Sequence, residues 1–150
     1  MAKSRYHIPL PLYKKILRVM PNLAVDAVVV HKGKFLLLRR AIPPRMGQWW
    51  IPGGRVLKGE SPEESARNKI YEETGIPIRL ERLLGVHSIY ERRWGIRIQT
   101  CTFVYLARPR NSPRVITNFN NKEWKWFTSI DQAWHPYVKK FIRLARHRSL

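Results

Sequence analysis

Acidic residues are scarce in this 150-residue chain. Ten Asp and Glu stand against 29 Lys and Arg, which gives a formal net charge of +19. A surface field of this sign attracts polyanions, whether these are nucleotide phosphates, RNA or an anionic membrane surface. The charge does not choose among these partners. It makes an anionic substrate the expectation and argues against a cationic one.

Cysteine and long apolar segments are also nearly absent. Cys101 is the single cysteine, so no internal disulfide can form, and its apolar neighbours predict a buried, inert thiol. No apolar run approaches the length of a membrane span, and no apolar segment follows the basic residues Lys3 and Arg5. We therefore expect a soluble cytoplasmic protein with no membrane partner. Without repeats or low-complexity linkers, residues 1–150 are expected to form one domain.

Hydrophobic periodicity predicts strands on both sides of one central helix. The expected strands cover residues 23–30, 35–40, 49–51, 78–90, 96–107, 114–117 and 124–127. The central helix is expected over residues 62–74, because Ser61 can cap it, Glu64 completes a capping box and Gly75 ends it. Shorter helices are expected over 12–20 and near the C-terminus. This order predicts an α/β sandwich around a mixed sheet.

The end of the central helix carries two adjacent carboxylates, Glu72 and Glu73. Residues three and four apart share a helical face, so position 69 lies beside them. Carboxylate oxygens suit Mg²⁺, a hard cation. The preceding Gly53-Gly54 turn lets a backbone carbonyl approach the same ion, because no side chain blocks it. A diphosphate could then bridge the metal and nearby arginines.

The segment from Gly54 to Ile76, GRVLKGESPEESARNKIYEETGI, resembles the box of the Nudix hydrolase family. The residues that match at the correct spacing are Gly54, Glu60, Ile70, Glu72, Glu73, Gly75 and Ile76. The resemblance extends from about Leu23 to Phe127. It implies a Nudix-type α/β/α sandwich, with residues 1–21 as a basic N-terminal extension. It also implies a hydrolase that uses Mg²⁺, or Mn²⁺, to cleave a substrate built on a nucleoside diphosphate.

Two positions depart from the box: Asn68 replaces an Arg, and Lys69 replaces the Glu that follows it. In typical family members this Glu helps to bind metal or to polarise the attacking water. Lys69 puts a positive charge there, so a second or third Mg²⁺ should bind poorly. We expect a single-metal site of Glu73, Glu72 and the Gly53 carbonyl. Lys69 itself either contacts a substrate phosphate or pairs with Glu73 as an ordinary surface ion pair.

One branch of the family, the GDP-mannose mannosyl hydrolases, also lacks that Glu. The strand that ends in Arg39-Arg40, the Pro-rich loop 41–48 and the run from Pro52 to Val56 resemble this branch. Such enzymes attack the anomeric carbon of the sugar and release GDP and a hexose. The resemblance would give Arg40 and Arg55 the grip on the diphosphate, which suits bidentate guanidinium forks. It would place Asp26 near the nucleoside or the sugar.

The branch also has a Gln-His pair, in which the His is the general base and the Gln helps to hold the metal. Asn120 and Asn121 occupy these positions here, and Asn is not a base at neutral pH. Asn120 could still offer its side-chain carbonyl to the metal. The base would have to be replaced by Glu123, His87 or Glu91; otherwise the activity is different or weak. The catalytic residues that we predict are Glu73, Glu72 and Glu123.

Three functions stay open at this point. The first is hydrolysis of an NDP-sugar such as GDP-mannose. The second is a nucleoside di- or triphosphate pyrophosphohydrolase that attacks phosphorus. The third is a degenerate Nudix domain that binds a nucleotide or RNA without catalysis, to which the +19 charge would contribute. A homodimer is also considered, because residues 1–21 carry apolar side chains beyond the minimal domain.

Overall fold

The computed structural model describes residues 7–117 and 121–147, which form one mixed sheet with helices beside it. The strands are β1 (Asn22–His31), β2 (Lys34–Arg40), β3 (Trp49–Trp50), β4 (Gly53–Arg55), β5 (Ile78–Arg93), β6 (Ile96–Pro109) and β7 (Asn121–Phe127). Their order is β3-β2-β1-β6-β5, with β4 paired to β1 and β7 to β2. Strands β1 and β6 run parallel, whereas β1–β2 and β5–β6 are antiparallel. The predicted mixed α/β architecture is confirmed.

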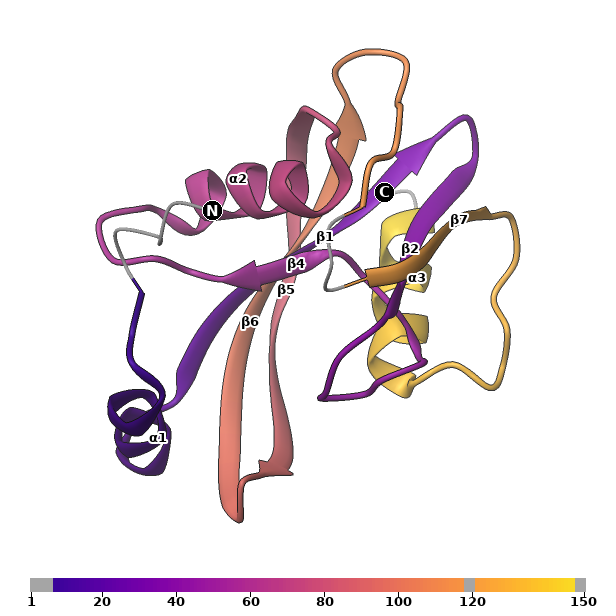
Figure 1. The fold of residues 1–150 in the computed structure, drawn as a ribbon. Coiled ribbons are helices and arrows are strands. Elements are labelled where there is room, and N and C mark those ends of the chain that lie inside the picture. The colour runs from indigo at the N-terminus through magenta and orange to yellow at the C-terminus, as the bar shows by residue number, and fades with distance from the viewer. Residues whose placement is uncertain (1–6, 118–120, 148–150) are drawn as a thin grey trace.

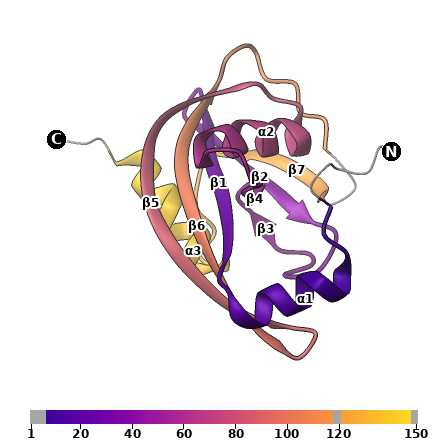
Figure 2. The same ribbon diagram turned by 90° about the vertical axis from the view of Figure 1, so that its left-hand side faces the viewer.

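Helices α2 (Pro62–Thr74) and α3 (Pro136–Arg146) lie on opposite sides of the sheet (Figures 1 and 2). Strand β1 supplies core residues to both sides, because successive side chains of a strand point to opposite faces. Val25 and Val29 pack with Ile70 of α2, whereas Val28 packs with Phe141 of α3. The β-branched run in β1 is therefore buried on both faces, as is typical of a strand covered by helices.

The boundaries of α2 agree with the capping signals in the sequence. The Glu64 N–H donates to the Ser61 hydroxyl at 3.1 Å, and the Ser61 N–H donates to the Glu64 carboxylate at 3.2 Å. At the other end, Gly75 takes the left-handed conformation with φ 71°, which a residue with a side chain adopts only at a cost. These caps fix where Glu72 and Glu73 emerge from the helix.

Helix α1 (Leu10–Val19) lies against the long β5–β6 hairpin, which extends beyond the rest of the sheet (Figure 1). Its buried residue, Leu17, packs with Ile96 and Ile98 of β6. Across the described ranges, none of the helices combines the length and apolarity needed to cross a bilayer.

Three local predictions need correction. Residues 114–117 do not form a strand: the Ile116 N–H donates to the Thr74 carbonyl at 2.7 Å, and the Ile116 side chain lies against Gly75. This segment is therefore attached to the end of α2. Gly53–Arg55, interpreted as a turn, forms the short strand β4. Cys101, predicted to be buried, is half-buried, with its sulfur 3.6 Å from the Ser88 hydroxyl.

Candidate active site

Glu73 lies at the centre of a cluster of polar side chains beside the end of α2. Its carboxylate accepts hydrogen bonds from the Asn121 amide at 3.1 Å and from the Gly53 backbone N–H. Burial raises the pKa of Glu73 to about 7, and the charge of Asp26 acts in the same direction. Asn121, Arg40 and the Gly53 N–H oppose this shift. A buried carboxylate of this kind favours a proton or a cation as its partner.

Asp26 brings a second buried carboxylate from β1. Its side chain accepts a 2.6 Å hydrogen bond from the Tyr137 hydroxyl of α3, and burial raises the pKa of Asp26 to about 7. Asp26 stands opposite Gly53 in the β1–β4 pairing. A Cβ at residue 53 would come within 1.9 Å of Asp26 Oδ1, so only glycine fits there. The close approach of β4 to the Asp26 carboxylate thus requires glycine at position 53.

Arg40 is the cation that acts on both carboxylates. Burial lowers the pKa of Arg40, whereas the charges of Glu73 and Asp26 raise it. Its Nε donates to the Pro44 carbonyl at 2.7 Å, which holds the guanidinium at the end of β2. The structure therefore brings together Glu73, Asp26, Arg40 and Gly53, four of the residues singled out in the sequence.

Lys69 and Glu72 form an ion pair on α2, with 3.2 Å between the ammonium nitrogen and the carboxylate oxygen. The partner of Lys69 is thus Glu72, one turn of helix away, and not Glu73. The Lys69 stem lies against Gly54, where a Cβ would come within 2.8 Å of its Cδ. In the other altered position, Asn68 donates to the Glu60 carboxylate at 2.9 Å. Box positions 60 and 68 are therefore joined by a hydrogen bond from the Asn68 amide.

Other predicted site residues lie apart from this cluster. The Arg55 guanidinium packs over the Tyr13 ring at 5.0 Å. Glu123 forms an exposed 2.9 Å ion pair with Arg39. A register shift between Arg39 and Arg40 places Asn121 opposite Arg40 and Glu123 opposite Arg39. Since neighbouring strand residues point to opposite faces, Asn121 and Glu123 follow these partners to opposite sides.

Two further candidates concern the base and the metal. His87 packs against the Tyr137 and Phe141 rings, where burial, followed by the charge of Lys140, lowers its pKa. Asn120, expected as a metal ligand, lies outside the described residues.

The donors near Glu73 fit one hard cation better than several. Within residues 7–117 and 121–147, no three His, Cys, Asp or Glu side chains gather into a metal cluster. A divalent ion would therefore need oxygen from backbone or amide groups in addition to Glu73 and Glu72. The Gly53 carbonyl is such a donor, and the raised pKa of Glu73 marks a carboxylate that gains by exchanging its proton for a metal.

A cavity of about 120 Å³ adjoins the cluster. It is lined by Ala24, Asp26, Arg40, Pro44, Arg45, Trp50, Ile89, Glu91, Thr100 and Thr102. Sequence reasoning missed Arg45 in this lining and Tyr137, which donates a hydrogen bond to Asp26. Tyr137 is 111 positions from Asp26, and no local pattern announces their contact. Arg45 sits in a Pro-rich loop whose path the sequence does not specify.

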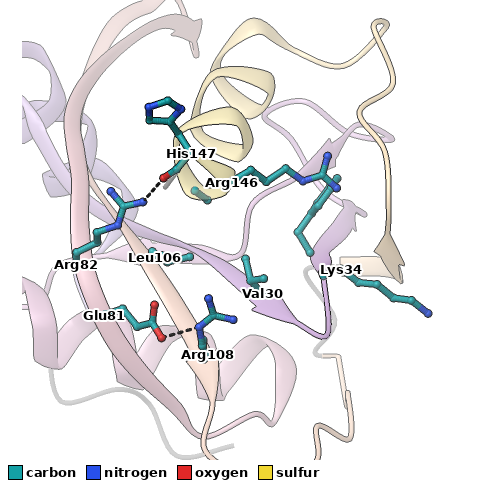
Figure 3. A pocket seen from close by; sticks show the side chains of 11 residues that line it. Val30, Lys34, Glu81, Arg82, Leu106, Arg108, Arg146 and His147 are labelled. Atoms are coloured by element: carbon teal, nitrogen blue, oxygen red, sulfur yellow. Dashed lines mark hydrogen bonds and ion pairs between the residues drawn. The ribbon is translucent and has the colours of Figure 1, made fainter. Parts of the chain in front are cut away.

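A second cavity, of about 550 Å³, lies elsewhere, between the β1–β2 turn, strands β5 and β6, and the end of α3. Figure 3 shows the Glu81–Arg108 ion pair at its wall and Arg82 bonded to the backbone of His147. These cations already have partners, so this cavity is less suited to binding an anion than its arginine content suggests.

The match to known protein families settles the classification. Residues 20–145 match the family described as the NUDIX domain. This chain belongs to the Nudix family. It is a Nudix hydrolase that acts on nucleoside diphosphate derivatives, and the resemblance seen in the box is confirmed. Nudix hydrolases generally use divalent metal ions such as Mg²⁺ or Mn²⁺.

The relatives of this chain are named for different activities. The low-salt glycan biosynthesis protein Agl8 of Haloferax volcanii is 34% identical over 143 residues, which cover 93% of this chain and 92% of Agl8. The ADP-ribose pyrophosphatase of Methanocaldococcus jannaschii is 40% identical over 81 residues, 54% of this chain but less than half (48%) of that protein. The crystal structure of a MutT NUDIX hydrolase from Burkholderia pseudomallei superposes with a TM-score of 0.70. It is 29% identical, and the match covers 83% of this chain and 98% of that one.

Proposed function

We propose that this Nudix hydrolase cleaves an NDP-sugar, such as GDP-mannose, by attack on the anomeric carbon. The observation that carries the proposal is the Lys69–Glu72 ion pair at 3.2 Å. A cation occupies the position where the box normally has a metal-binding carboxylate, so the site is suited to one divalent ion. The similarity to a glycan biosynthesis protein over nearly the whole chain supports a sugar-linked substrate.

Glu73, Glu72 and the Gly53 carbonyl would hold this ion, Mg²⁺ or Mn²⁺, and the Asn120 carbonyl is a further proposed ligand. When bound, the metal supplies positive charge against the diphosphate oxygens and so makes the nucleoside diphosphate a better leaving group. The raised pKa of Glu73 predicts that a proton leaves when the metal arrives.

Arg40, Arg55 and Lys69 would bind the substrate phosphates. Arg40 lies near Glu73 and Asp26, and its Nε donates to the Pro44 carbonyl, so its Nη atoms are the donors that would bind a phosphate. Lys69 would have a second role: with Glu72 as a metal ligand, the Lys69 ammonium would lose its carboxylate partner and would be free to pair with a substrate phosphate. Arg55, at the end of β4, would have to leave the Tyr13 ring to reach the same group.

Asp26 would bind the sugar end of the substrate, since it lines the cavity beside Arg40. The Tyr137 hydroxyl fixes its orientation through a 2.6 Å hydrogen bond. Glu123 stays the predicted general base, with His87 and Glu91 as alternatives. To act, Glu123 would have to release Arg39, which holds it on the exposed side of β7.

A second candidate function is hydrolysis at phosphorus. The 40% identity to an ADP-ribose pyrophosphatase over 81 residues favours it. It requires the same grip on the diphosphate but places the attacking water on a phosphate.

The test is turnover of a substrate panel by the purified chain with Mg²⁺. The panel contains NDP-sugars, ADP-ribose, nucleoside triphosphates and dinucleoside polyphosphates. The proposal predicts that an NDP-sugar has the highest kcat/KM and yields NDP and free sugar. Clear release of pyrophosphate from triphosphates, with no NDP-sugar turnover, would eliminate it.

A further inference from the structure

The small cavity beside the active site is closed on one side by an ion pair that the sequence does not announce. Arg45, from loop 41–48, and Glu91, from β5, meet at 2.6 Å between Nη1 and Oε2. Their side chains are only 15% and 21% exposed. The Arg45 guanidinium also packs on the Trp50 ring at 4.7 Å. A pair withdrawn from water in this way carries a desolvation cost, unlike an exposed surface pair.

The loop is built to hold Arg45 in this place. Arg45 takes a left-handed φ of 62°, which is unusual for a residue with a long side chain. The Gly47 N–H donates to the Arg40 carbonyl at 2.8 Å, and Arg40 Nε donates to the Pro44 carbonyl at 2.7 Å. The loop is therefore tied on both sides of Arg45 to the residue proposed to bind the diphosphate.

The size of the cavity indicates what can enter it. Its volume of about 120 Å³ is below the roughly 300–1,000 Å³ of pockets that enclose a whole drug-sized ligand. It suits a fragment of the substrate, on the scale of a single ring, and excludes a complete nucleotide.

The lining of the cavity indicates the chemistry of that fragment. Asp26 and Glu91 offer carboxylate acceptors, Thr100 and Thr102 offer hydroxyls that both donate and accept, and Arg45 offers donors. An alternation of charged acceptors and donors matches a neutral ring that carries several hydroxyl groups. Sites that hydrogen-bond a substrate hydroxyl discriminate strongly, because an analogue without it leaves a buried polar group unpaired.

We infer that Arg45 and Glu91 are specificity-determining residues, which hydrogen-bond the hydroxyls of the glycosyl group and select its configuration. This inference rests on the proposed function, because it requires an NDP-sugar as the substrate. Arg40 and the metal ligands would bind the diphosphate, which all NDP-sugars share. Arg45 and Glu91 would bind the glycosyl group, in which NDP-sugars differ.

Epimeric substrates test this assignment. GDP-mannose and GDP-glucose differ at C2, and UDP-glucose and UDP-galactose differ at C4, so each pair shares its nucleoside diphosphate. In Glu91→Gln we expect kcat/KM for the preferred sugar to fall about tenfold or more and the epimer ratio to fall at least about fivefold. The inhibition constant of the NDP alone should change less than about twofold, since the NDP does not enter the cavity.

A charge exchange separates recognition from a structural tie between the loop and β5. The double variant Arg45→Glu with Glu91→Arg keeps an ion pair but moves the donors and acceptors. We expect it to restore Tm toward the wild type without restoring the epimer ratio. Glu81→Gln is the matched control: Glu81 is also on β5 and in a 2.6 Å pair, with Arg108, but at the distant cavity (Figure 3). It should leave the epimer ratio unchanged.

Three results would overturn the inference. A wild-type epimer ratio in the exchanged variant would make the pair a structural tie only. Equal losses of NDP and NDP-sugar binding in Glu91→Gln would place its action on the nucleotide. If the exchanged variant does not fold, the epimer ratios of Glu91→Gln and Arg45→Lys decide the question.

Absence of NDP-sugar turnover in the wild type would instead remove the proposed function itself, together with this inference.

Discussion

The Lys69 ammonium lies 3.2 Å from the Glu72 carboxylate, one turn away on α2. Lys69 is one of the two departures of this chain from the family box: it replaces a carboxylate at position 69, and its ion pair neutralises the carboxylate at position 72. Glu73 is left as the buried carboxylate at the centre of the site. We propose a single metal ion because Glu73 is the only one of these three positions whose carboxylate is outside an ion pair with a described residue.

Replacing Lys69 by Glu should therefore increase the number of bound metal ions. The variant restores the box carboxylate and frees Glu72, so we expect Mn²⁺ binding to rise from about one ion per chain to two or more. Equilibrium dialysis with detection of free Mn²⁺ by electron paramagnetic resonance gives this number without reference to activity. Lys69→Met is the control, since it removes the cation without adding a ligand. Equal stoichiometry in Lys69→Glu and the wild type would contradict the single-ion account.

Glu73→Gln should weaken metal binding and turnover by at least about 100-fold. The same variant should fold normally, because burial already disfavours the charged form of Glu73 and an amide of the same shape removes that charge. Turnover, Mn²⁺ affinity and Tm measure the two effects separately. Glu63→Gln, at the exposed start of the same helix, is the comparison and should keep both activity and affinity. Turnover close to wild type in Glu73→Gln would remove this residue from the site.

If Glu123 is the general base, Glu123→Gln should lower kcat by about 100-fold or more while KM changes little. Arg39→Met provides the comparison, because it breaks the same 2.9 Å ion pair but keeps the carboxylate. Activity should survive in Arg39→Met and be lost in Glu123→Gln. Equal and small effects in both variants would show that Arg39 and Glu123 form only a surface ion pair. His87 and Glu91 would then be the candidates for the base.

The cap of α3 predicts a dependence of stability on pH. His135 Nδ1 accepts from the Tyr137 N–H at 3.1 Å, which requires an unprotonated ring nitrogen. Burial, followed by the charges of Arg45 and His87, lowers the pKa of His135 below its ordinary value of 6.5, whereas Glu91 acts in the opposite direction. A histidine with a lowered pKa in the folded state contributes fully above about pH 6.5 and loses this contribution as the pH falls.

Unfolding by urea at about pH 7.5 and about pH 5.5 measures this contribution. We expect the wild type to lose about 1 kcal/mol more than His135→Asn between these pH values, because Asn caps the helix without titrating. An identical pH dependence in the two proteins would show that protonation of His135 does not break the cap.

The sequence was most informative where a function is encoded locally. The limits of α2 follow from Ser61, Glu64 and Gly75, and all three behave as their types predict. The box spacing predicted a Nudix family member, and the match of residues 20–145 to the NUDIX domain confirms the family. Arg40, singled out by resemblance as a diphosphate-binding residue, lies near Glu73 and Asp26, and its role in binding stays a prediction.

What the sequence could not supply depends on contacts between distant segments. The Tyr137–Asp26 hydrogen bond and the Arg45–Glu91 ion pair join residues 111 and 46 positions apart. The strand expected at 114–117 fails because the Thr74 carbonyl, at the end of α2, takes the Ile116 N–H. Arg55 was assigned from its neighbours in the sequence, yet its guanidinium lies on Tyr13 of α1. The local sequence pattern around each of these residues does not predict such long-range contacts.

Hydrolysis in ¹⁸O-water is the most direct measurement of the proposed chemistry. The purified chain is incubated with Mg²⁺ and the NDP-sugar that it turns over fastest, and both products are analysed by mass spectrometry. Attack at the anomeric carbon predicts that the label appears in the released sugar and that the NDP is unlabelled. Label in a phosphate group would contradict the account and establish attack at phosphorus, whether that phosphate belongs to an NDP released with unlabelled sugar, to an NMP or to a sugar phosphate.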